Sequence, residues 1–193
     1  MKKLLFAVVI ALAASSGASG GARSAPWGSY VGTAKGTDAF VAVLVGKRVT
    51  GGRQQVLGYV CDSKRIAEWF HGTTAGPGFT VRSGAGATLT VTVASGPATG
   101  TFTLAGAAHS FTAPLAKRPA ELYRGQKTAH GKHYLGGWIV LPDHRQRGAV
   151  KTGSTITASP QLTGFTTPIG GLAVSVASAG TITVGFITPI GQL

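Results

Sequence analysis

The chain has 193 residues, of which 30 are glycine and only 12% are charged. Eighteen Lys and Arg against five Asp and Glu give a formal net charge of +13, which favours polyanionic partners. The single cysteine, Cys61, cannot form an intramolecular disulfide, so the class of small disulfide-stapled secreted proteins is excluded. Stability must therefore come from an apolar core.

Residues 1–22 are expected to be a signal peptide. Lys2 and Lys3 form a basic start, Leu4–Ala14 an apolar centre, and Ser15–Ala22 a stretch of small residues suited to cleavage. The apolar centre is short for a bilayer span. We therefore expect a secreted, extracellular protein without a membrane anchor after cleavage, either free or associated with the cell envelope.

Residues 23–36 are rich in Gly, Ser and Ala and are interpreted as a linker into a β domain spanning residues 37–150. That domain opens with Asp38–Val45, whose seven uninterrupted apolar residues predict a strand buried on both faces. Gln55–Cys61 is the next predicted strand. Cys61 is interpreted as a small buried residue, because a catalytic thiolate would need a basic pocket.

The segment Asp62–His71 fits two structures. Ile66, Trp69 and Phe70 have the spacing of one helix face, and Asp62 is a suitable helix cap. The very short connections to the neighbouring predicted strands favour a strand instead. A strand is the prediction, and a short helix is the alternative.

From Gly78 onward, apolar residues alternate with threonine, which predicts strands with one apolar and one hydroxyl face. The connections are short and contain Gly, as in hairpins. Four strands in about forty residues predict an antiparallel meander, since parallel pairing needs long crossovers. The alternating apolar residues are Phe79 and Val81; Leu89, Val91 and Val93; Phe102 and Leu104; and Phe111 and Ala113.

Three more strands are predicted at Glu121–Arg124, Tyr134–Leu141 and Gln146–Val150, with a turn at Pro142–Arg145 before the last. The fold class is therefore all-β. The antiparallel meander is expected to close as a small barrel or as a two-layer sandwich, and strand spacing alone leaves both open.

Residues 151–193 form an extension in which no charged side chain follows Lys151. It contains an imperfect twofold repeat, because Gly164–Leu172 and Gly185–Leu193 match at seven of nine positions. Two copies are too few for a solenoid. We expect β-hairpins that pack on the domain; a segment ordered by a partner is the alternative.

Basic residues gather between Lys117 and Lys151, with aromatic residues among them. Such a mixture can bind a polyanion through charge and stacking. The anion-binding candidates are Lys117, Arg118, Arg124, Lys127, Lys132, Arg145, Arg147 and Lys151, and the aromatic candidates are Trp69, Tyr123, Tyr134 and Trp138. No DNA- or RNA-binding signature is present, so no specific nucleic acid is expected.

Other chemistry has weaker support. His130, His133 and His144 could approach one another, but their cationic neighbours oppose a bound metal ion, so neither a metal nor another cofactor is expected. The serine-nucleophile motif Gly-x-Ser-x-Gly is absent from the sequence, and no catalytic residue is assigned. The five carboxylates leave a hydrolase open.

Several segments resemble a known kind of domain. They are Tyr59–Asp62, Ile66–Phe70, Leu122–Arg124 and Gly137–Asp143. Together they resemble a small secreted all-β domain of unassigned function from high-GC Gram-positive bacteria. The resemblance extends over about Tyr30–Val150 and implies a secreted β domain, with no catalytic residue.

The sequence thus favours a secreted non-catalytic β domain that contacts an anionic envelope surface or polymer through the basic segment. A small β-barrel that binds an apolar ligand is the first alternative, and a secreted hydrolase is the second. The oligomeric state is left open.

Overall fold

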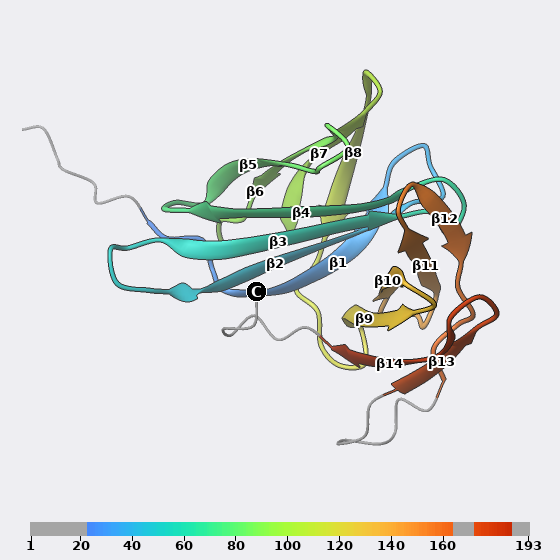
Figure 1. Cartoon of the computed structure of the whole chain (residues 1–193). Coiled ribbons are helices and arrows are strands. Elements are labelled where there is room, and N and C mark those ends of the chain that lie inside the picture. Colours follow the sequence, from blue (N-terminus) through green and yellow to red (C-terminus); the bar gives the residue numbers. More distant parts are fainter. Residues whose placement is uncertain (1–22, 164–171, 187–193) are drawn as a thin grey trace, which may run out of the picture.

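The computed structural model describes residues 23–163 and 172–186, and these form fourteen strands in two antiparallel sheets (Figure 1). The predicted signal peptide and most of the repeated segments 164–172 and 185–193 lie outside the described residues. Within those that are described, no helix is long and apolar enough to cross a membrane.

The first sheet is a nearly closed barrel. Its strand order is β4-β3-β2-β1-β8-β7-β6-β5, and a bridge between Phe70 and Ser83 brings the two edge strands together. The strands are β1 (Gly28–Ala34), β2 (Phe40–Arg48), β3 (Gln54–Cys61), β4 (Ala67–Thr74), β5 (Gly78–Arg82), β6 (Thr88–Thr92), β7 (Ala98–Leu104) and β8 (Ala107–Ala113).

The second sheet lies against the barrel wall formed by β1, β2, β3 and β4. Its order is β12-β11-β10-β9-β14-β13. The strands are β9 (Glu121–Ala129), β10 (Lys132–Val140), β11 (Gln146–Thr152), β12 (Thr155–Ala158), β13 (Leu172–Val176) and β14 (Gly180–Phe186). The structure thus combines the predicted barrel with the predicted two-layer packing, because the second sheet lies against one wall of the barrel.

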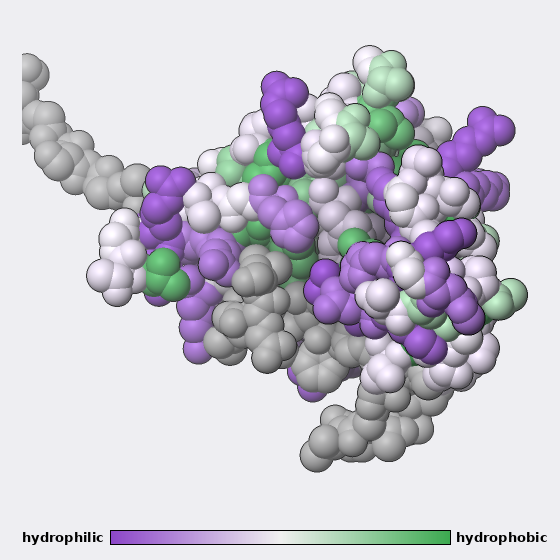
Figure 2. Space-filling view, viewed as in Figure 1, coloured by the Kyte–Doolittle hydropathy of each residue, from purple (hydrophilic) through white to green (hydrophobic). Residues whose placement is uncertain are grey.

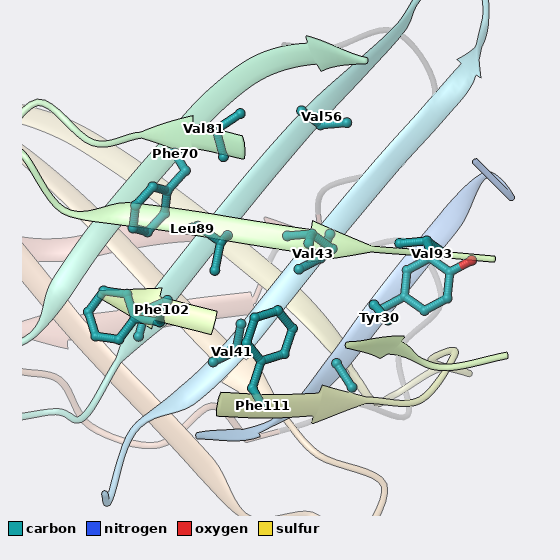
Figure 3. Packing of buried hydrophobic residues seen from close by; sticks show 14 of the residues in the cluster. Tyr30, Val41, Val43, Val56, Phe70, Val81, Leu89, Val93, Phe102 and Phe111 are labelled. Atoms are coloured by element: carbon teal, nitrogen blue, oxygen red, sulfur yellow. The ribbon is translucent and has the colours of Figure 1, made fainter. Parts of the chain in front are cut away.

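Side chains from all eight strands fill the barrel interior (Figure 3). Phe70 and Phe102 meet edge to face, with ring centroids 6.3 Å apart. Burial of this many aliphatic and aromatic groups is the main favourable term in a chain without disulfides.

The strand predicted to be buried on both faces is confirmed as β2. Val41, Val43 and Val45 point into the barrel, whereas Ala42 and Leu44 point toward the second sheet. An uninterrupted apolar run is therefore required here, because neither face of this strand meets water.

The antiparallel meander is confirmed, since β5, β6, β7 and β8 pair in sequence order. The preference for a strand over a helix in Asp62–His71 is also confirmed, because β4 begins at Ala67. Asp62 caps a tight turn rather than a helix: its Oδ1 accepts the backbone N–H groups of Lys64, Arg65 and Ile66 at 2.7–2.8 Å.

The linker prediction for residues 23–36 is wrong over Gly28–Ala34, which is β1 and lies between β2 and β8. Small residues are needed here for close approach rather than for flexibility. A Cβ on Gly32 would lie 2.1 Å from the backbone oxygen of Thr112.

The described parts of the C-terminal extension complete the second sheet. β12 pairs with β11, and β14 pairs with β9. Side chains of the domain also hold the extension: Tyr134 donates its hydroxyl to Ser178 O at 3.0 Å, and the Trp138 indole N–H donates to Pro160 O at 3.1 Å. The extension is thus an integral part of the fold.

Candidate anion-binding surfaces

The strand register divides the predicted basic segment between two faces of the second sheet. Arg124, Arg147 and Lys151 share the face of Leu122 and Ala149, which is turned toward the barrel. Lys127 and Lys132 belong to the opposite face. The structure therefore does not bring the eight candidates together on one surface.

Four of the eight have clear structural partners. Arg118 lies 3.5 Å from Glu121, Arg145 lies 2.7 Å from Asp143, and Lys151 lies 3.4 Å from Glu68. Arg147 donates from Nε to Asp38 O at 3.1 Å, and its guanidinium lies 4.9 Å from the centre of the Phe40 ring. These cations help to fix loops and the contact between the layers.

The other four form no salt bridge with a carboxylate within the described residues. Lys127 donates to Thr181 O of β14 at 3.1 Å, and Arg124 donates to Gln126 Oε1 at 3.0 Å. Lys117 and Lys132 are exposed. They contribute positive charge to the surface without forming one patch.

Three of the four aromatic candidates are not available for stacking. Tyr123, Tyr134 and Trp138 are buried in a cluster between the second sheet and the extension. Burial raises the pKa of Tyr123 to about 12, and its hydroxyl donates to Pro119 O at 2.8 Å. As surface aromatics these three predictions are corrected: the rings are core residues, because residues of the extension cover the sheet face on which they lie.

Trp69 is the one aromatic candidate that keeps partial exposure. Its ring packs on Tyr59 with centroids 4.2 Å apart, and the Arg124 guanidinium lies 5.9 Å from the ring centre. Burial, followed by the nearby Arg124 charge, lowers the pKa of His71. A cation already covers the aromatic surface here.

The histidine and cysteine side chains are the remaining candidates for metal binding or thiolate chemistry. The described residues contain no group of three or more His, Cys, Asp and Glu side chains that could hold a metal ion. Cys61 is buried, and burial raises the pKa of its thiol, which opposes formation of a thiolate.

Each of the five carboxylates has a structural partner. Asp62 accepts backbone N–H groups, and each of the others forms a salt bridge. Asp38 and Asp62 lie in the turns before β2 and after β3, and Glu68 lies near the start of β4. Arg145, the partner of Asp143, lies over Phe40 at the start of β2. Four of the five acidic residues thus gather toward one end of the barrel.

The opposite barrel end is basic, and the sequence analysis did not identify it. This basic end is formed by the N-terminal segment, the β2–β3 hairpin and the chain after β8. The first two lie at the left in Figure 1, in a region where Figure 2 shows mainly hydrophilic residues. It carries the exposed cations Arg23, Lys47, Arg48 and Arg53 together with Trp27, Val49 and Leu115.

Contacts hold these residues together. The Lys47 Nζ lies 5.1 Å from the centre of the Trp27 ring, and a Cβ on Gly28 would lie 2.7 Å from Leu115. The Arg53 guanidinium donates to Thr73 Oγ1. A signal in the sequence was available, since Lys47–Arg53 holds three cations in one turn without an acidic residue.

The basic end also holds the exposed apolar residues. Trp27, Val49 and Leu115 are 56%, 57% and 55% exposed, and they are the large exposed hydrophobic residues of the described chain. None of the five carboxylates lies in the segments that form this end. The surface thus combines positive charge with apolar side chains.

In comparisons with known proteins, no family model, no curated protein and no solved structure matches the chain.

Proposed function

We propose that this protein is a secreted, non-catalytic β domain that binds an anionic surface or polymer of the cell envelope. The observation that carries the proposal is the separation of most carboxylates from the cations at the basic end of the barrel. Four cations without a carboxylate occupy the basic end, whereas four of the five acidic residues lie toward the other end.

The separation is large on the scale of electrostatic screening. β2 runs from the end that bears the carboxylates to the basic end over nine residues, or roughly 26 Å at the usual rise per residue. This length is more than twice the screening distance of about 8 Å at physiological salt. A polyanion at the basic end is therefore attracted by the local cations with little repulsion from the distant carboxylates.

A non-catalytic role agrees with the remaining groups. The carboxylates are engaged in turns and ion pairs, and Cys61 is buried within the core that joins the two layers. An apolar-ligand carrier has less support, because side chains from every strand of the barrel occupy its interior.

The binding part of the proposal is tested with the mature chain and a soluble polyphosphate. Affinity is expected to fall by at least about tenfold between about 50 and 300 mM salt, because several exposed cations contribute. Binding that is absent at low salt, or that does not change with salt, would overturn the proposal.

A charge-matched pair of variants locates the surface. The K47Q/R48Q/R53Q variant removes three cations from the basic end, and K35Q/R65Q/R82Q removes three exposed cations near the opposite end. The first is expected to lower polyphosphate affinity by at least about tenfold and the second by about twofold or less. Equal losses would show that net charge, rather than the basic end, governs binding.

The secretion part of the proposal is tested by N-terminal sequencing of the extracellular protein. Cleavage is expected after Ala18, Gly20 or Ala22, where small residues precede the cut. Cleavage after Ala25 is not expected, because Pro26 follows and Ala25 is buried in the barrel core. A protein that retains its leader inside the cell would contradict secretion.

A further inference from the structure

We propose that the basic end docks on an anionic phospholipid bilayer, with Trp27, Val49 and Leu115 entering the headgroup region. This inference rests on the proposed function, since it names the anionic partner of the same surface. It adds an apolar component that a soluble polyanion would not require.

The apolar component is the first argument. The three exposed hydrophobic residues could lie anywhere on the surface, yet all lie at the barrel end that carries the cations and lacks carboxylates. Tryptophan is favoured at membrane interfaces because its ring is apolar while its N–H remains hydrogen-bonded. Apolar and cationic side chains on one surface are the combination that interfacial binding to anionic lipid uses.

The cations fit the headgroup layer in the same way. Each Lys or Arg close to an anionic leaflet strengthens binding by about fivefold. The Lys47 Nζ lies 5.1 Å from the centre of the Trp27 ring, so one charge and one insertable ring stand side by side. Long basic side chains can also keep their charged ends at the phosphates while their stems cover apolar groups.

The structure holds Trp27 in a fixed position. Ala25, two residues before Trp27, is buried in the barrel core, and its carbonyl accepts a hydrogen bond from Gln54 Nε2 at 2.9 Å. Pro26 O accepts the hydroxyl of Tyr30 at 3.1 Å. The chain on the N-terminal side of Trp27 is thus tied to the barrel, and exposure of the ring does not result from a loose end.

The partner is a lipid surface rather than a single small anion. Arg48 and Arg53 donate to Ala75 O and Thr73 Oγ1, at the end of β4 and in the turn after it, instead of converging on one point. Spread cations with apolar residues between them match a plane of many headgroups.

The test uses the mature chain with two kinds of vesicle, one of phosphatidylcholine and one with about one third phosphatidylglycerol. Co-sedimentation is expected to show binding at least about tenfold stronger to the anionic vesicles. Brominated lipid is expected to quench the Trp27 signal, because the other two tryptophans, Trp69 and Trp138, are partly or fully buried.

Two variants separate the apolar from the charged component. W27S, alone or with L115S, is expected to lower vesicle binding by about tenfold while polyphosphate binding changes by less than twofold. K47Q/R48Q/R53Q is expected to lower both, and K35Q/R65Q/R82Q to leave both within about twofold. All substituted side chains are exposed, and an unchanged thermal midpoint verifies folding.

The outcomes distinguish the two proposals. Salt-dependent polyphosphate binding without vesicle binding overturns the membrane inference and leaves the proposed function intact. Vesicle binding that W27S/L115S does not weaken also overturns it, since charge alone would then suffice. Absence of binding to both probes overturns both proposals.

Discussion

Gly137 of β10 lies directly against Tyr59 of β3, at the contact between the second sheet and the barrel. A Cβ on Gly137 would stand 2.6 Å from the tyrosine ring, and the Tyr59 hydroxyl lies 3.4 Å from Gly137 O. Trp69 stacks on the same tyrosine. The two layers therefore meet closely at a position where β10 has no side chain.

The substitution G137A tests this contact. The added methyl group must displace two packed aromatic rings, so a loss of about 1–3 kcal/mol in the free energy of unfolding is expected. Urea denaturation measures the change. G84A is the matched control, because a Cβ there meets no atom within 4 Å and its loss should stay within about 0.5 kcal/mol. Equal losses for the two variants would contradict the close contact.

The substitution Y134F tests how the extension is held. It removes the hydroxyl that donates to Ser178 O and leaves the buried ring, so a loss of about 0.5–1.5 kcal/mol is expected. Hydrogen exchange of residues 172–186 should also accelerate. Y30F removes a comparable bond to Pro26 at the basic end and should not affect exchange in that segment. Unchanged exchange in Y134F would show that the extension is held by other contacts.

The periodicity of the sequence was sufficient for the fold class, because it reports which faces of a strand meet water. The seven apolar residues of Asp38–Val45 require burial on two sides, and the barrel interior and the second sheet provide it. Threonine alternation in β5–β8 likewise requires one buried face. Such patterns are local, so one strand at a time can be read from them.

Composition was misleading where backbone packing governs the choice of residue. Gly28–Ala34 has the small residues of a linker, yet β1 is covered by neighbours on both sides. Gly32 is required by the backbone of Thr112 in β8, eighty residues away in sequence. Nothing in the sequence of Gly28–Ala34 indicates this contact with β8.

The candidate site could not be predicted for a similar reason. Tyr123 and Arg124 are adjacent in sequence and were grouped as one surface, but neighbours on a strand point to opposite faces. The basic end is instead assembled from Trp27, the Lys47–Arg53 turn and Leu115. Only the strand order of the barrel brings these three segments together.

The burial of Cys61 predicts an unreactive thiol. Burial raises its pKa, and Sγ accepts the backbone N–H of Ser63 at 3.3 Å. Reaction with an aromatic disulfide reagent should be slower in the native protein than in denaturant by on the order of 100-fold, because the chain must open first. A native rate close to the denatured one would contradict burial and would reopen a role for the thiolate.

Glu121 predicts a specific pH dependence of stability. Burial raises the pKa of its carboxyl, and the Arg118 charge 3.5 Å away offsets only part of that effect. The folded state therefore holds this proton more tightly than the unfolded chain, so its stabilising contribution is complete below the ordinary glutamate pKa. It is lost as the pH rises through the folded-state value. E121Q removes this titration, and its stability relative to the parent should rise across that window and remain higher at neutral pH.

D143N is the opposite control, because the hydrogen bond from Arg145 lowers the pKa of Asp143, so that variant should lose stability relative to the parent as the pH rises. Urea denaturation at a series of pH values measures both differences, and a flat or falling difference for E121Q would show that the Arg118 ion pair outweighs burial.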